Sequence, residues 1–248
     1  MRLLILENYE SIIRWTADYI IKRINDFAPS SDKAFVLGLP TGSSPLGVYK
    51  ELIAAFNEKK VSFSNVITFN MDEYLGLSGE DPQSYKRFMQ DNFFNAVDIR
   101  LENTHIPDGM AKDPEAECLA YEQAITAAGG IELFLGGIGV NGHIAFNEPG
   151  SSLSSRTRLQ ILDYETRASN ARFFDGDINK VPKKAITVGI GTIMDAREVL
   201  VIVSGRSKAK ALQLAVEGGV SQECPVSCLQ KHPSAIIVCD EDAAIELK

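Results

Sequence analysis

Short apolar runs of four to six residues recur along the chain, and longer amphipathic stretches separate them. Runs of this length, bounded by polar and turn-forming residues, are typical of strands that are buried on both faces. They predict strands at Leu3–Leu6, Ala34–Leu39, Val66–Phe69, Ile131–Leu135, Ala185–Ile190, Val199–Val203 and Ala235–Cys239.

The intervening stretches carry apolar residues at the helical period. The clearest stretch runs from Ile12 to Phe27, and another helix is predicted to begin at Pro45 and to continue through Phe56. Strands that alternate with helices predict the α/β class, with an open, mainly parallel sheet and helices on both faces. Ligands of such sheets bind beyond the carboxyl ends of the strands, so we expect the loops there to carry the function.

The chain has 248 residues, of which 45% are hydrophobic, and no Pro/Gly/Ser-rich linker divides it. We therefore expect a single domain over residues 1–248. The N-terminal apolar run is too short for a signal peptide, and no stretch is long enough to span a membrane, which predicts a cytoplasmic protein. The formal net charge of −8 argues against binding to nucleic acid.

The cysteines form no CxxC pair and have no companion histidine, so their spacing predicts neither a zinc site nor a disulfide framework. We expect reduced thiols and no bound metal. The cysteines are Cys118, Cys224, Cys228 and Cys239.

The segment richest in candidate chemistry is GGIGVNGHIAFNEPG, Gly136–Gly150, which follows a predicted strand directly. Its glycines suit a loop shaped around a bound molecule. His143 lies in this loop, and histidine ordinarily titrates near neutral pH, which suits reversible proton transfer. Glu148 follows five residues later and can orient the ring or share its proton. The alternative is that His143 is an ordinary hydrogen-bonding residue of a turn.

Gly137, Gly139 and Gly142 also spell the GxGxxG fingerprint of dinucleotide-binding proteins. That fingerprint should open a helix, whereas the residues that follow here, HIAFNEPGSS, indicate a loop. Nucleotide binding is therefore the minor alternative for this segment. The GxxxxGK[ST] pattern of ATP-binding loops is absent.

Two other loops suit an anion. Pro40–Pro45 follows one predicted strand and opens a helix, and Ser204–Lys208 does the same after another. Hydroxyl and amide N–H groups at a helix start bind anions, and a lysine there is unfavourable unless an anion is bound. A serine-rich helix cap is an equally good interpretation of the first loop, and Lys208 can instead be solvated.

Asp72 and Glu73 stand at the end of the predicted strand Val66–Phe69. Because adjacent side chains diverge in an extended chain, only one of the two can face a cleft. That residue is a candidate general base. The alternative is a pair of solvated loop acids.

The stretch Ser151–Asn179 is long, weakly periodic and rich in arginine. Long loops often cover active sites, and arginine suits phosphate recognition. We therefore expect a mobile, basic lid around residues 160–182; the alternative is a surface helix with solvated charges. The arginines are Arg156, Arg158, Arg167 and Arg172.

Two anion-binding loops, a carboxylate and a histidine with a nearby glutamate imply a small phosphorylated ligand. A carboxylate and a histidine without a metal suit proton transfers next to a carbonyl or a ring hemiacetal. This combination predicts sugar-phosphate isomerisation.

Four long motifs resemble those of the glucosamine-6-phosphate deaminase family (glucosamine/galactosamine-6-phosphate isomerases). They are LPTGSSPLGVYKEL, FNMDEYLGL, GGIGVNGHIAFNEPGSS with SRTR, and RFFDGDINKVPKKAITVGIGTIMDA. The resemblance runs from end to end and implies a Rossmann-like fold of the sugar-phosphate isomerase type. It also implies conversion of glucosamine 6-phosphate and water to fructose 6-phosphate and ammonia in amino-sugar catabolism, with no cofactor.

The resemblance assigns His143 to opening of the pyranose ring and Asp72 to proton transfer between C2 and C1 through an enediol-type intermediate. It assigns Glu148 to orienting and charge-balancing His143. The residues that it implies for phosphate binding are Thr41, Gly42, Ser43, Arg172 and Lys208.

Asn141 stands where well-known family members have an aspartate that completes a carboxylate–histidine–carboxylate relay. An amide oxygen can still accept the imidazole N–H, so we expect retained activity with an altered pH profile. The family's allosteric pocket for N-acetylglucosamine 6-phosphate is represented by Ser151 and Arg158, but Gln160 replaces its lysine. This change, with the chain's end at Lys248, argues against regulation. Regulated members are typically hexamers, so the resemblance implies a homo-oligomer without fixing its size.

Two alternatives stay open at this point. A 6-phosphogluconolactonase-like hydrolase has a similar glycine–histidine loop, but typically an arginine after the Asp-Glu pair, where this chain has Tyr74. A non-catalytic sugar-phosphate sensor is favoured by Asn141 and opposed by the presence of Asp72, His143 and Glu148.

Overall fold

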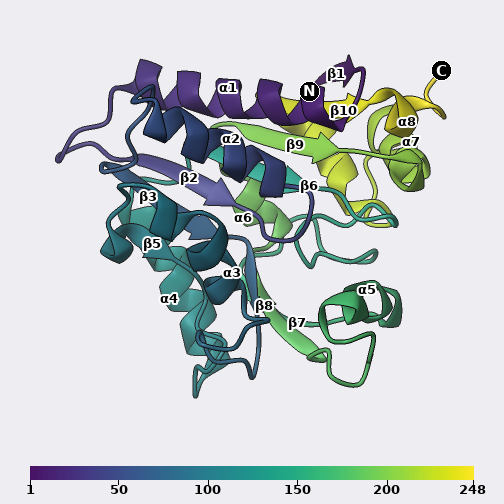
Figure 1. Ribbon diagram of the computed structural model, residues 1–248. Helices are drawn as coiled ribbons and strands as arrows, with labels where there is room; N and C mark the ends of the chain where they lie inside the picture. The colour runs from purple at the N-terminus through teal and green to yellow at the C-terminus, as the bar shows by residue number, and fades with distance from the viewer.

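The computed structural model describes residues 1–248 and is built around a seven-stranded sheet (Figure 1). All neighbouring strands of this sheet run parallel, which confirms the predicted α/β class. In spatial order the strands are β1 (Arg2–Leu6), β10 (Ala235–Asp240), β9 (Val199–Val203), β6 (Leu133–Gly137), β2 (Phe35–Leu39), β3 (Val66–Asn70) and β5 (Thr104–His105).

Helices cover both faces of this sheet (Figure 1). One face packs against α1 (Tyr9–Phe27), α2 (Leu46–Asn57) and α3 (Tyr85–Asn92), and the other against α4 (Pro114–Ala127), α6 (Ile190–Met194), α7 (Ala209–Glu217) and α8 (Glu241–Ala244). Short 3-10 turns are η1 (Phe94–Ala96), η2 (Leu101–Asn103), η3 (Ala171–Phe173), η4 (Arg206–Lys208) and η5 (Pro225–Lys231).

The alternation of side chains along each strand explains the two layers. In β9, Val199 and Val201 pack with α4, α6 and α7, while Leu200 packs with α1 and α2 on the opposite face. The strand must therefore be apolar at every position, as its sequence is. Helix α1 begins where the Asn8 side chain accepts a hydrogen bond from the Ser11 N–H, 3.0 Å away.

The predicted strand Ala185–Ile190 is buried as expected, but the prediction that it belongs to the parallel sheet is wrong. A separate antiparallel sheet consists of β4 (Asp72–Tyr74), β8 (Lys184–Thr187) and β7 (Arg158–Ile161). Ile190 already begins α6. The reason is that β3 continues almost directly into β4, and β4 pairs with β8 rather than with a strand of the large sheet. Next to this pair, the Val188 N–H donates to the Met71 carbonyl at 2.8 Å.

The predicted lid region, residues 160–182, is folded against the small sheet. It contains α5 (Tyr164–Asn170) and η3, which lie beyond the end of β7 and apart from the large sheet in Figure 1. A satellite hydrophobic cluster holds it in place. The members of this cluster are Tyr74, Phe146, Leu162, Ala171, Phe174, Val181 and Ala185. Its mobility stays a prediction.

Strands β2 and β6 lie at the point where the strand order reverses. From β2 the chain proceeds outward to β3 and β5, and from β6 it proceeds the other way to β9 and β10. The loops that leave these neighbouring strands therefore separate and open a crevice. We therefore expect a ligand to bind at the carboxyl ends of β2 and β6.

The cysteines are all free and buried. None of the helices combines the length and apolar character that a membrane crossing requires.

Candidate active site

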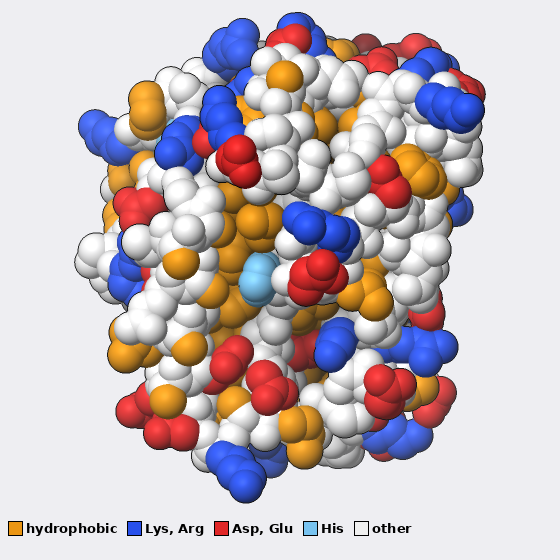
Figure 2. Space-filling view, turned by 90° about the vertical axis from the view of Figure 1, so that its left-hand side faces the viewer, with side chains coloured by type: hydrophobic (Ala, Val, Ile, Leu, Met, Phe, Trp, Pro, Cys, Tyr) orange, Lys and Arg blue, Asp and Glu red, His pale blue; other side chains and the backbone are white.

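A cavity of about 260 Å³ lies at this crevice. Its walls come from the loops after β2, β3 and β6, from α5 and η3, and from η4. Figure 2 shows the hollow on the molecular surface, with a histidine at its wall and hydrophobic side chains beside it. His143 is the histidine that lines the cavity.

One end of the cavity is suited to an anion. Thr41, Gly42 and Ser43 lie between the end of β2 and the start of α2 and line this end. Gly42 has φ +92°, a conformation that favours glycine, and it lets the loop turn its polar groups toward the cavity. Arg172, from η3, lies with its Nη2 3.4 Å from the Ser43 Oγ.

Lys208 reaches the same end from η4. Burial, together with the positive charge of Arg172, lowers the pKa of Lys208. Neither cation forms an ion pair with a carboxylate of the chain. Two converging cations without a counter-charge favour a bound dianion such as phosphate.

The other arginines of the predicted basic lid do not reach the cavity. Arg156 pairs with Glu122 and Asp195, and Arg167 donates to the Ile178 carbonyl. Their charges hold the fold together, so Arg172 alone supplies the lid's cation to the cavity.

Asp72 and Glu73 diverge as the strand geometry predicts. Glu73 turns away from the cavity and its carboxylate accepts the backbone N–H groups of Tyr74, Tyr85 and Lys86 at 2.8–3.0 Å, which caps the start of α3. Asp72 faces the cavity and accepts no hydrogen bond from the protein. Of the two, Asp72 is therefore the carboxylate free to act on a ligand.

Asp72 is almost fully buried. Burial, with a smaller contribution from the charge of Glu73, raises the pKa of Asp72 to about 8. A carboxylate of this kind is a stronger base than an exposed one, once it is ionised, and its pKa lies near the working pH of a metabolic enzyme.

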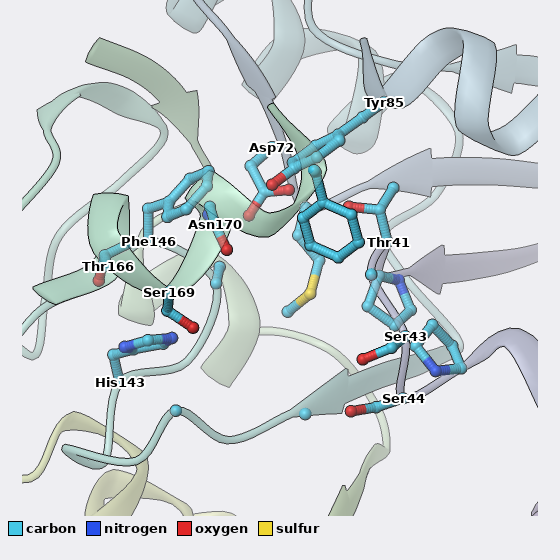
Figure 3. Close-up of a pocket in the computed structure, with 18 of the residues that line it drawn as sticks. Thr41, Ser43, Ser44, Asp72, Tyr85, His143, Phe146, Thr166, Ser169 and Asn170 are labelled. Atoms are coloured by element: carbon cyan, nitrogen blue, oxygen red, sulfur yellow. The ribbon is translucent and has the colours of Figure 1, made fainter. Parts of the chain in front are cut away.

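His143 lies on the opposite side of the cavity from Asp72 (Figure 3). The sharp turn from Gly139 to His143 places the imidazole against the backbone of Gly139, where a Cβ atom would lie 2.2 Å from the ring. The ring's Nδ1 lies 3.4 Å from Glu148 Oε2 and has no other partner. The sequence therefore requires glycine at 139 so that His143 can stand beside Glu148.

Asn141 does not contact the imidazole as we expected. Its Oδ1 accepts the backbone N–H of His143 at 3.2 Å, and its Nδ2 donates to Glu148 Oε2 at 3.0 Å. The amide thus caps the turn and contacts Glu148 instead of the ring. Burial by itself would raise the pKa of Glu148. The adjacent His143 and the hydrogen bonds from Thr166 and Asn141 outweigh the effect of burial, so the pKa of Glu148 is lowered.

Ser151, Arg158 and Gln160 come together outside this cavity. The Arg158 guanidinium donates to Ser151 Oγ at 3.2 Å, to Gln160 Oε1 at 3.1 Å and to Asn147 Oδ1 at 2.7 Å. All three acceptors are neutral, and they engage three of the five N–H groups of the guanidinium.

Sequence reasoning missed several residues that line the cavity. Thr166, Ser169 and Asn170 are spaced i, i+3 and i+4, which places them on one face of α5. This polar face was the available signal in the sequence. Tyr85 and Phe146 also line the cavity, and nothing in their local pattern marks them.

The fold and cavity define an α/β protein of the sugar-phosphate isomerase type. Residues 7–238 match the family model described as glucosamine-6-phosphate isomerases/6-phosphogluconolactonase. The chain belongs to this family.

Relatives within the family are similar over their whole length. A glucosamine-6-phosphate deaminase of Porphyromonas gingivalis W83 is 59% identical over 100% of this chain and 94% of its own. A solved structure, a monomeric glucosamine-6-phosphate deaminase, has 42% identity and a TM-score of 0.94, covering 99% of each chain. A 6-phosphogluconolactonase from Thermotoga maritima has a TM-score of 0.75 at 20% identity, covering 97% of this chain and 99% of its own, and shares the fold.

The raised pKa of Asp72 predicts a stability gain on its removal. Between pH 3.8 and about 8 the residue is ionised in the unfolded chain and protonated in the folded one. Asp72 therefore destabilises the folded chain increasingly as the pH rises through this range. We expect Asp72→Asn to raise the Tm only slightly near pH 5 and by roughly 3 °C or more at pH 8.5, as measured by calorimetry.

The matched control is Glu73→Gln. Both oxygens of Glu73 accept backbone N–H groups, so the amide of glutamine would face one of these donors with its own N–H groups. This variant should lower the Tm. An Asp72→Asn variant that is destabilised at pH 8.5 would contradict the assignment of a desolvated, unpaired carboxylate.

Proposed function

We propose that this chain converts glucosamine 6-phosphate and water to fructose 6-phosphate and ammonia. The observation that carries the proposal is the position of Asp72, which is buried, accepts no hydrogen bond and faces the same cavity as the anion-binding loop and His143. The 59% identity to a glucosamine-6-phosphate deaminase, over the full chain, supports the same reaction.

The phosphate binds first to the loop Thr41–Ser43, Arg172 and Lys208 in this mechanism. These groups supply hydroxyl and N–H donors and two positive charges. The sugar then extends from this end toward the carboxyl end of β3 and the loop after β6, where Asp72 and His143 lie.

Ring opening requires a proton to leave the C1 hydroxyl and a proton to reach the ring oxygen. His143 performs both transfers, because imidazole gives and takes protons near neutral pH. Glu148, with its lowered pKa, stays ionised and balances the imidazolium while that ion exists. The product is the open-chain amino aldehyde.

Asp72 then removes the proton from C2 while the cationic amine of the substrate passes a proton to the C1 carbonyl oxygen, which leaves an enol-amine, the enediol-type intermediate. Return of that proton to C1 gives the imine at C2. Addition of water to C2 and loss of ammonia yields fructose 6-phosphate. The cationic amine of the substrate stabilises the ionised form of Asp72, which offsets its desolvation when the substrate binds.

The alternatives have less support. The resemblance to the 6-phosphogluconolactonase from Thermotoga maritima, at 20% identity, extends to the fold alone. A sensor without catalysis would not need a carboxylate kept free of hydrogen bonds at the cost of stability, and Asp72 is such a carboxylate.

The proposal includes a single domain, a cytoplasmic location and a mobile lid around residues 160–182. It also includes a homo-oligomer, a hexamer by family resemblance, although one similar solved structure is a monomeric deaminase. The small molecule is the only ligand that the function requires, and the reaction needs no cofactor.

The test of the function is turnover of glucosamine 6-phosphate, followed as ammonia and fructose 6-phosphate. Asp72→Asn should lower kcat by about a hundredfold or more with little change in KM, because the carboxylate acts in the transition state and not in phosphate binding. Native protein that releases no ammonia, or an active Asp72→Asn variant, would contradict the proposal.

Asn141→Asp should move the acid limb of the kcat/KM profile to higher pH by about one pH unit. The new carboxylate would remove a donor from Glu148, which raises the pKa of that carboxyl, and would favour the protonated imidazole. Kinetics between pH 5 and 9 measure the shift. An unchanged acid limb would place residue 141 outside the proton relay.

N-acetylglucosamine 6-phosphate should leave the activity of the native chain unchanged. Three N–H groups of Arg158 are engaged by Asn147, Ser151 and Gln160, and a neutral glutamine stands at position 160 where the family has a lysine. Substrate saturation curves with and without the acetylated sugar measure this. A rise in activity or the loss of a sigmoidal curve on its addition would show that the pocket is functional.

A further inference from the structure

Helix α5 buries only one of its residues, Thr166. The Thr166 hydroxyl donates a hydrogen bond to Glu148 Oε1, and both residues are inaccessible to solvent or nearly so. The single fully buried side chain of this helix thus contacts a carboxylate of the candidate active site. Figure 3 shows Thr166 on the same side of the cavity as His143.

This hydrogen bond fixes how Glu148 faces His143. With Oε1 held by Thr166, the carboxylate can present only Oε2 to Asn141 Nδ2 and to the imidazole Nδ1. The Nδ1 atom has no other partner. Without Thr166, rotation of the carboxylate would weaken the one contact that orients the ring.

The same segment carries Arg172 to the anion-binding end of the cavity. Helix α5 continues without a break into η3, and Arg172 of η3 lies beside Ser43 Oγ. One short helical segment therefore contacts Glu148 through Thr166 and reaches the anion-binding end of the cavity through Arg172.

We propose that Thr166 is a positioning residue that couples phosphate capture by Arg172 to the alignment of Glu148 with His143. A bound phosphate attracts Arg172 and so holds α5 and η3 against the cavity, which holds Thr166 on Glu148. Binding energy from the distant phosphate is thereby used to orient the groups that move protons. This inference rests on the proposed roles of His143 and Glu148.

Thr166→Val tests the hydrogen bond with little change in shape, and Thr166→Ser retains the hydroxyl. We expect Thr166→Val to lower kcat about tenfold or more with little change in KM, and Thr166→Ser to stay close to native. Tyr164→Phe is the matched control, because it removes an exposed hydroxyl of the same helix that makes no hydrogen bond and lies outside the cavity.

The pH profile separates positioning from a merely structural role. The titratable groups around Glu148 are His143, and Asp163 and Glu165 at the start of α5. Loss of the Thr166 donor raises the pKa of Glu148, so the acid limb of kcat/KM should move to higher pH in Thr166→Val only. A native profile and a native kcat in Thr166→Val would overturn the proposal.

Double variants test the coupling itself. In an Arg172→Gln background, and in a Glu148→Gln background, Thr166→Val should lower kcat by much less than it does in the native chain. Effects that multiply independently in both backgrounds would overturn the coupling. If Thr166→Val fails to fold, Thr166→Ala in the same cycles, with the Tm of each variant, gives the comparison.

Native turnover distinguishes this proposal from the function on which it rests. Absence of ammonia release by the native chain would reject the proposed function. Normal native turnover together with an indifferent Thr166→Val variant would reject only the role of Thr166.

Discussion

The reversal of strand order between β2 and β6 is the constraint on which the rest of the molecule depends. Because the chain leaves these adjacent parallel strands in opposite directions, their following loops cannot pack on each other and must line an open crevice. The β2 loop supplies hydroxyl and N–H groups, and the β6 loop supplies His143 and Glu148. Asp72 enters the same crevice from the end of β3.

The cavity combines groups that a stable fold would ordinarily avoid. Asp72 is buried without a hydrogen bond, and Lys208 and Arg172 converge without a counter-ion. Each arrangement is unfavourable in the empty protein and becomes favourable when a cationic amine or an anionic phosphate is bound. By contrast, Glu73 and Glu122 have every oxygen engaged and serve the fold. Charged side chains without a partner therefore mark the site, and charged side chains with every oxygen hydrogen-bonded stabilise the fold around it.

The segment that carries α5 connects these groups although it lies outside the large sheet. It packs on its own hydrophobic cluster and lines the cavity with residues that include Thr166 and Arg172. This separate cluster is the reason for proposing the segment as a mobile lid. In that proposal, a ligand that bridges the two ends of the cavity orders the segment and the proton-transfer groups together.

The sequence by itself determined six of the seven strands of the large sheet and the α1 helix, because their apolar periodicity acts locally. The two-residue strand β5 has no such apolar run and was not predicted. The sequence also showed that Asp72 and Glu73 must diverge. Only the tertiary structure decided which of them faces the cavity, since that choice depends on the distant backbone of α3. Tertiary pairing likewise placed Ala185 in an antiparallel sheet and Thr166 on Glu148. Contacts between residues far apart in sequence leave no local pattern, which is why these features required the folded chain.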